Sequence, residues 1–184
     1  LFRSVKNPGL ALTDFFKSSY DVSGWQDINV PGSWELQGFD APIYTDVTYP
    51  FKANPPFAPQ DYNPVGHYVH EFTVPQDWNG MDVIMDFEGV ESAFYLWING
   101  KMVGYSEDSR LPAHFDITKY LKKGTNRLAV KVFRFSDGSY LEDQDYWKYS
   151  GIERNVFIQA RPKSRMNDFV LGNSLVNRYK DGED

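Results

Sequence analysis

The residues best suited to chemistry lie in one string, SDGSYLEDQDYW at residues 136–147, which combines four acids with three aromatic rings. Hydrolysis of a glycosidic bond needs two carboxylates about 5–5.5 Å apart for retention of configuration, or about 6.5–9.5 Å apart for inversion. Asp143 and Asp145 would meet such a spacing on an extended backbone, as any Asp-x-Asp pair would. On composition alone, a solvated acidic loop or a metal-binding loop is the favoured alternative.

Aromatic side chains near acids also suit sugar binding. The apolar face of a pyranose can stack on a ring while its hydroxyls hydrogen-bond to carboxylates. The rings that could serve in this way are Trp34, Tyr44, Tyr140, Tyr146 and Trp147. The alternative is that most rings of a β-sandwich fill its core, since the chain has 31 of them (14 Phe, 12 Tyr and 5 Trp).

The sequence lacks the residues that several other kinds of site require. The chain has no Cys, which excludes disulfides, thiolate zinc sites and a Cys nucleophile. His67, His70 and His114 form no metal-ligand pattern with carboxylates, and a structural role is expected for them. There is no Gly-rich phosphate loop and no Gly-x-Ser-x-Gly elbow.

Length and charge narrow the class of protein further. A chain of 184 residues suits one domain with a sizeable core. Its net charge of −6 is opposite in sign to that of typical nucleic-acid-binding proteins, so no nucleic-acid partner is expected. No apolar run is long enough to span a bilayer, so no membrane partner is expected either. The chain opens at Leu1 without Met, so we expect a piece of a longer protein, and the cellular location stays open.

The elements that would position these residues are strands. Gly and Pro recur about every ten residues, and alternating or continuous apolar runs fill 66–74, 81–87, 93–98, 101–105, 126–135, 152–160 and 168–171. Asn99-Gly100 between two apolar runs predicts a hairpin. Residues 31–64 hold seven of the eleven prolines and predict a long ordered loop. We therefore predict an all-β fold, a jelly-roll β-sandwich of antiparallel sheets.

Five strings carry a family resemblance. They are VPGSWELQGFDAPIYTDVTYPF (30–51), NPPFAP (54–59), NPVGHY (63–68), DFEGVESAFYLWINGKMVGYSEDSRLPAHFDIT (86–118) and FSDGSYLEDQDYWKYSGIERNV (135–156). Together they resemble the N-terminal domain of the large lactose-type β-galactosidases of glycoside hydrolase family 2. The resemblance implies a galactose-binding-domain-like jelly roll over residues 1–162, with an edge strand that begins upstream of Leu1. Residues 163–184 would then start an immunoglobulin-like domain or form a linker.

The resemblance also implies specific roles. Both catalytic glutamates of such enzymes lie in a separate TIM barrel, so no catalytic residue is expected here and Asp143 and Asp145 should not be a catalytic pair. Asp145 resembles a residue that contacts a galactosyl hydroxyl and ligates sodium, in a site that other domains complete. Asp46, in YTDVTYP, stands where the family has an Asn that contacts substrate. An ionised Asp only accepts hydrogen bonds, whereas an amide also donates, so this contact is expected to change polarity or be lost.

Glu107 and Asp137 match two ligands of the family's structural magnesium site. Its other ligands would lie upstream of Leu1. The expected partners are a galactoside substrate and the remaining domains of a homo-oligomeric parent enzyme. Two alternatives stay open, namely a stand-alone carbohydrate-binding module and the same domain from a β-glucuronidase or β-mannosidase type of hydrolase.

Overall fold

The computed structural model of the chain describes residues 1–173, 175–176 and 181–182. Within this part of the chain the regular structure consists of β-strands and short 3-10 turns, which confirms the prediction of an all-β fold. No helix formed by these residues is long and apolar enough to cross a membrane. The turns are η1 (Pro8–Leu10), η2 (Glu35–Gln37), η3 (Gln76–Trp78), η4 (Thr118–Tyr120) and η5 (Asp137–Tyr140).

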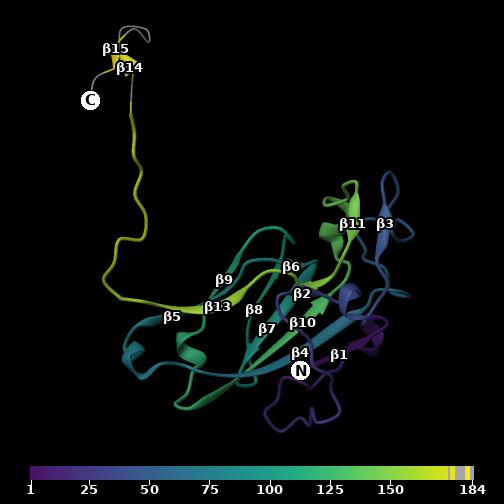
Figure 1. Cartoon of the computed structure of the whole chain (residues 1–184), viewed down its shortest axis with the longest axis horizontal. Helices are drawn as coiled ribbons and strands as arrows, with labels where there is room; N and C mark the ends of the chain where they lie inside the picture. The colour runs from purple at the N-terminus through teal and green to yellow at the C-terminus, as the bar shows by residue number, and fades with distance from the viewer. Residues whose placement is uncertain (174, 177–180, 183–184) are drawn as a thin grey trace.

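The largest sheet forms one layer of a sandwich (Figure 1). Its antiparallel strands lie in the order β1 (Phe2–Val5), β4 (Val65–Thr73), β10 (Thr125–Phe133), β7 (Ala93–Ile98) and β8 (Lys101–Glu107). The predicted hairpin joins β7 to β8, where Asn99 and Gly100 take φ angles of 51° and 80°. Positive φ at both positions is what a type I′ turn requires, and Asn and Gly tolerate it best.

Two smaller sheets form the second layer. One contains β13 (Val156–Arg161), β5 (Asp82–Phe87) and β9 (Ala113–Asp116), and the other contains β2 (Gly32–Ser33), β12 (Gly151–Ile152) and β6 (Val90–Glu91). Alternate side chains of β5 and β7 meet in the core between the layers, namely Val83, Met85 and Phe87 from β5 and Phe94, Leu96 and Ile98 from β7. This face-to-face packing is the predicted jelly-roll β-sandwich.

The N-terminal segment covers the side of the large sheet that points away from the core between the layers. There Phe15 and Trp25 pack against Val69, Trp97 and Ala129 of the sheet. His67 is fully buried in this layer. Its Nε2 accepts a hydrogen bond from the backbone N–H of Leu12 at 3.1 Å, and its Nδ1 lies 3.1 Å from the carbonyl oxygen of Arg3. Burial lowers the pKa of His67 to about 4, so the ring is neutral and holds backbone segments together.

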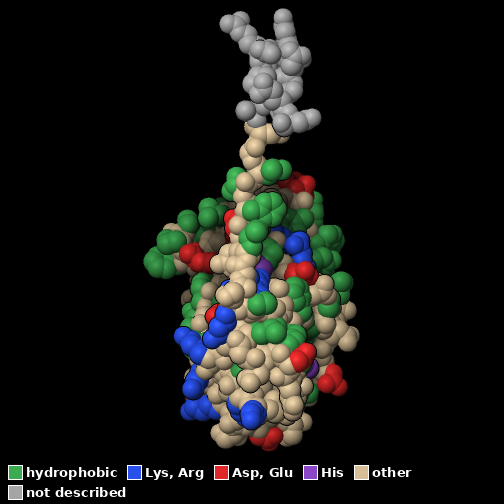
Figure 2. Space-filling view, turned by 90° about the vertical axis from the view of Figure 1, so that its left-hand side faces the viewer, with side chains coloured by type: hydrophobic (Ala, Val, Ile, Leu, Met, Phe, Trp, Pro, Cys, Tyr) green, Lys and Arg blue, Asp and Glu red, His purple; other side chains and the backbone are tan. Residues whose placement is uncertain are grey.

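The chain leaves the sandwich after β13, and residues 162–173 run away from its body (Figures 1 and 2). The predicted strand at 168–171 is wrong. These residues are irregular, and Val170 and Leu171 are 93% and 89% exposed. An apolar run becomes a strand only where a neighbouring strand pairs with it. Beyond it, β14 (Leu175–Val176) pairs with β15 (Asp181–Gly182). The domain boundary at 162 and the nature of 163–184 stay predictions.

Candidate functional site

A two-stranded antiparallel ribbon stands apart from the strands of the sandwich (Figure 1). It consists of β3 (Ile43–Thr45) and β11 (Tyr146–Lys148), with Thr45 opposite Tyr146 and Tyr44 opposite Trp147. The sequence predicted a loop over 31–64 and missed β3. A three-residue strand is too short to show periodicity, and its partner lies about a hundred residues away in the sequence.

One face of this ribbon points to solvent and carries the two predicted sugar-contact acids. Tyr44 and Trp147 are 52% and 50% exposed, and Asp46 and Asp145 are exposed as well. Continuing the register by one residue places Asp46 opposite Asp145. Since alternate residues of a strand share a face, these four side chains lie on one side, which we call the outer face. The structure thus brings together two acids that are distant in the sequence.

The outer face combines hydrogen-bond acceptors with aromatic rings. The Tyr44 hydroxyl donates to Oδ1 of Asp145, and this hydrogen bond raises the pKa of Tyr44, with the charges of Asp145 and Asp46 acting in the same direction. The rings of Tyr44 and Trp147 lie 5.5 Å apart at 55°. Carboxylates accept sugar hydroxyls and exposed rings receive the apolar face of a pyranose, so this surface can bind a sugar.

Three of the five rings proposed as sugar platforms are corrected by the structure. Trp34 is completely buried in the core and donates to the Tyr68 hydroxyl. The hydroxyl of Tyr140 accepts from the Asn54 backbone N–H at 2.9 Å and donates to the Phe57 carbonyl at 3.0 Å, which ties down the 46–64 loop. Tyr146 faces inward, with its ring under the cations of Arg110 and Lys148. Each ring satisfies packing or hydrogen bonding inside the domain.

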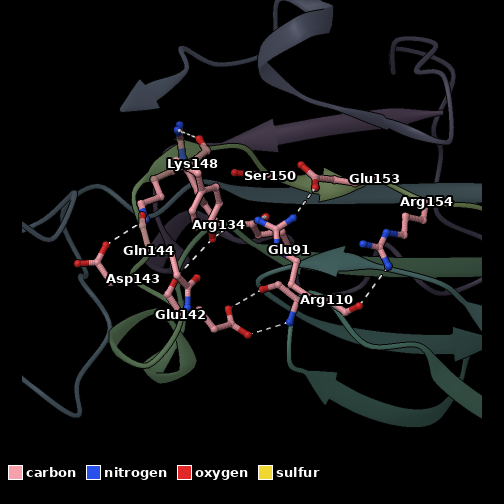
Figure 3. A network of polar contacts seen from close by, with 12 residues as sticks. Glu91, Arg110, Arg134, Glu142, Asp143, Gln144, Lys148, Ser150, Glu153 and Arg154 are labelled. Atoms are coloured by element: carbon pink, nitrogen blue, oxygen red, sulfur yellow. Dashed lines mark hydrogen bonds and ion pairs between the residues drawn. The ribbon is translucent and has the colours of Figure 1, made fainter. Parts of the chain in front are cut away.

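The acidic string is divided between the two faces of the ribbon. Asp143 pairs with the buried Lys148 at 3.0 Å on the inner side, whereas Asp145 lies on the outer face. Glu142 accepts from the backbone N–H and the hydroxyl of Ser109 at 2.9 and 2.6 Å (Figure 3). Asp143 and Asp145 therefore do not form a pair across a common substrate, although their spacing in the sequence allowed one.

A buried ionic network beneath the ribbon was not expected from the sequence (Figure 3). Arg134 lies 3.5 Å from Glu35, and both side chains are 0% exposed. Burial raises the pKa of Glu35, and the nearby Arg134 opposes that rise. Glu91 contacts Arg110 at 2.9 Å, yet burial dominates and raises the pKa of Glu91 to about 8. The sequence signal was Arg134 between Phe133 and Phe135 at the end of β10, since a charge flanked by apolar residues indicates burial with a partner.

Comparison with known proteins assigns the family. Residues 10–162 match the family described as glycosyl hydrolases family 2, sugar binding domain. The chain belongs to this family. It is 50% identical to a β-galactosidase of Priestia megaterium over 99% of its length and 53% identical to one of Pseudoalteromonas haloplanktis over 90%.

Solved structures support the fold of this family 2 domain. A β-glucuronidase of Bacteroides uniformis matches 88% of the chain with a TM-score of 0.65 and 25% sequence identity. The chain spans less than a fifth of the length of these relatives, at 18% and 16% of the two β-galactosidases and 17% of the β-glucuronidase. The match to a family 2 sugar-binding domain confirms the resemblance that the sequence strings suggested.

The outer face of this family 2 domain fits a role as part of a sodium site. Asp145 is exposed, and within the described part of the chain the Tyr44 hydroxyl donates to its Oδ1, so that Oδ2 can meet an ion or a hydroxyl. The described residues contain no group of three or more His, Asp and Glu side chains that could hold a metal alone. Asp145 thus suits one position of a ligand set that other parts of the protein would complete.

Glu107 and Asp137 fit a cation in a different way. Burial raises the pKa of Glu107, a hydrogen bond from Tyr105 opposes that rise, and the negative charge of Asp137 adds to it. Oε2 of Glu107 is buried and has no hydrogen-bond partner among the described residues. A bound divalent cation would satisfy this oxygen and remove the repulsion between the two acids.

Proposed function

We propose that this domain forms a wall of the sugar-binding site of a β-galactosidase that hydrolyses terminal β-D-galactosides with retention of configuration. The domain is non-catalytic, and the two catalytic glutamates belong to another part of the polypeptide. The observation that carries the proposal is the outer face, where Asp46, Asp145 and two rings point to solvent from one side of a ribbon. The 50% identity to a β-galactosidase supports the choice of substrate class.

Each residue of the outer face has a task in this proposal. Tyr44 donates to Oδ1 of Asp145 and orients the carboxylate. Oδ1 has room for a second donor, a galactosyl hydroxyl, and Oδ2 would ligate sodium, while Trp147 covers an apolar face of the sugar. Asp46 accepts a second hydroxyl. Sodium, when bound, supplies a hard positive charge that attracts hydroxyl oxygens and offsets the two carboxylates. Glu107 and Asp137 would hold a structural magnesium ion, which would supply a positive charge to offset the two carboxylates.

The remaining domains of a homo-oligomeric parent enzyme complete the site. Binding energy from the outer face assists hydrolysis only to the extent that these contacts strengthen in the transition state. A β-glucuronide is a poorer candidate substrate, although a β-glucuronidase is among the similar structures. Such a sugar carries its own carboxylate, which Asp46 and Asp145 would repel.

The test is Asp145→Asn in the complete polypeptide that contains this chain. With a nitrophenyl β-D-galactoside as substrate, we expect kcat to fall and the activation by sodium to disappear, because the amide is a weak cation ligand. Asp77→Asn is the matched control, since Asp77 is an exposed acid in η3, outside the ribbon. Unchanged kcat and an unchanged sodium response in Asp145→Asn would contradict the proposal.

Calorimetry distinguishes a half-site from a stand-alone carbohydrate-binding module. We expect no heat when the 184-residue chain is titrated with millimolar galactose or lactose, because the outer face provides one side of the site. Measurable heat that Trp147→Ala removes would favour the stand-alone module instead.

A further inference from the structure

Arg134 is a completely buried cation that touches neither of the sugar-contact acids. It directly follows β10, and its side chain is 0% exposed. Placing an arginine inside a sandwich is costly unless its donors are satisfied. The partners of its guanidinium group therefore indicate what the arginine is for.

Those partners include the two chain segments that flank the ribbon, two carboxylates, and the Tyr62 hydroxyl, which accepts from Nη1 at 3.2 Å. Nη2 of Arg134 donates to the carbonyl oxygen of Ala41 at 3.0 Å and to that of Lys148 at 3.2 Å. Ala41 lies two residues before β3 begins, and Lys148 is the last residue of β11. One nitrogen thus joins the chain that enters β3 to the chain that leaves β11. We call residues 40–41 and 148–150 the root of the ribbon.

Two carboxylates fix the guanidinium group in place. Nη1 donates to Oδ2 of Asp40 at 2.5 Å, and Nη2 lies 3.5 Å from Glu35. Glu35 in turn accepts from the backbone N–H and the hydroxyl of Ser150, both at 3.0 Å. Figure 3 shows Arg134 close to Lys148 and Ser150 at this point of the fold. Arg134, Asp40 and Glu35 thus each contact a residue of the root or belong to it.

The ribbon depends on its root for a defined position. Its two strands have three residues each, and an isolated two-stranded ribbon is marginal in water. The outer face points to solvent, so the ribbon is supported by the contacts of Tyr146 on its inner face and by its root. Displacement of a substrate-contacting group by about 1 Å can lower a rate by about a hundredfold. The acids of the outer face therefore need a rigid anchor at the root to keep them in position.

We propose that Arg134 is a positioning residue that holds Asp145 and Asp46 at the sugar through the two strands of the ribbon. This inference rests on the function proposed for the outer face. Lysine cannot replace it, because the guanidinium group presents five donors in a planar fork whereas an ammonium group has three on one atom. A single atom cannot reach two carbonyls and two carboxylates at these distances.

The test compares Arg134→Lys with Arg127→Lys in the complete polypeptide. Arg127 lies on β10, and its Nη2 donates to the carbonyl oxygens of Phe15 at 3.4 Å and Tyr20 at 3.3 Å, away from the ribbon. Arg134→Lys should accelerate amide hydrogen exchange in 43–45 and 146–148 and lower kcat for a nitrophenyl β-D-galactoside about 10- to 100-fold. Arg127→Lys should leave both unchanged.

A double variant separates positioning from general destabilisation. If Arg134 acts through Asp145, Arg134→Lys combined with Asp145→Asn should lose little more kcat than the more severe single variant. Multiplied losses, or unchanged exchange in the ribbon, would overturn the inference. If Arg134→Lys does not fold, Asp40→Asn replaces it, because it keeps the guanidinium group but weakens its anchor, and a smaller change in the same direction is expected.

The two proposals fail in different ways. If Asp145→Asn alone leaves kcat unchanged, the proposed function of the outer face is wrong, whatever Arg134 does. If Asp145→Asn lowers kcat while Arg134→Lys loosens the ribbon without lowering kcat, the positioning role is wrong and the proposed function stands.

Discussion

Glu91 is an ionisable group that the sandwich buries at the cost of stability. Its side chain is 8% exposed, and its pKa is raised to about 8 from 4.5, mainly by burial. Arg110, at 2.9 Å, lowers that pKa but does not offset the burial. We predict that Glu91→Gln stabilises the domain at pH 8, because the amide resembles the neutral acid and has no charge to desolvate.

The sign of the pH dependence follows from the two pKa values. The folded state binds the Glu91 proton more tightly than the unfolded state. The stability contributed by Glu91 is therefore fully present below pH 4.5 and is lost as the pH rises through 8. At about 1.4 kcal/mol per pKa unit, the whole loss is about 5 kcal/mol, of which about 3 kcal/mol falls between pH 5 and pH 8.

The assay is urea unfolding of the 184-residue chain and of Glu91→Gln at pH 5 and pH 8. The free energy of unfolding of Glu91→Gln should exceed that of the parent chain by about 3 kcal/mol more at pH 8 than at pH 5. Because both chains contain His67, comparing them at the same pH cancels its contribution to the free energy of unfolding. That contribution has the opposite pH dependence, since the stability from neutral His67 is lost as the pH falls from 6.5 to about 4.

Glu71→Gln is the matched control, since Glu71 is an exposed carboxylate on β4. The difference in the free energy of unfolding between Glu71→Gln and the parent chain should be the same at pH 5 and at pH 8. The reasoning would be refuted if the difference in the free energy of unfolding between Glu91→Gln and the parent chain did not change with pH, or if it decreased toward pH 8. Such a result would mean that the attraction of Arg110 exceeds the cost of burial and that Glu91 is stably ionised.

Two further predictions concern the first residue of β12, directly after the root, and the outer face of the ribbon. Gly151→Ala should lower the free energy of unfolding by about 2–4 kcal/mol, because φ is 117° and the new methyl group would lie 2.9 Å from the Trp34 ring. Urea unfolding beside Gly24→Ala, which has open space, checks this, and equal losses would contradict it. Asp46→Asn in the complete polypeptide should raise the sodium concentration for half-maximal activity, because it removes a negative charge opposite Asp145; an unchanged sodium titration would contradict this.

The strands of the sandwich could be predicted because their information is local. Alternation over 81–87 and the Asn99-Gly100 turn depend on neighbouring residues, and β5 and the β7–β8 hairpin lie where they were expected. The strand predicted at 168–171 failed for the opposite reason. Its apolar residues resemble a strand, but pairing depends on a partner that the described residues do not provide there.

For the candidate site too, some features could be predicted from the sequence and others depended on the tertiary structure. The residue strings alone pointed to Asp145 and Asp46, through their resemblance to a family of hydrolases. The sequence also showed an acidic, cysteine-free chain and predicted an all-β fold. Each of these conclusions depends on residue identity and short-range order, which folding does not change.

Only the tertiary structure decided which of these residues act together. It placed Asp46 opposite Asp145, turned Tyr146 inward and Trp147 outward, and joined both strands of the ribbon to Arg134. These outcomes depend on the register between segments about a hundred residues apart. A slip of one residue would reverse every side chain of the ribbon, and no local pattern of the sequence specifies that register.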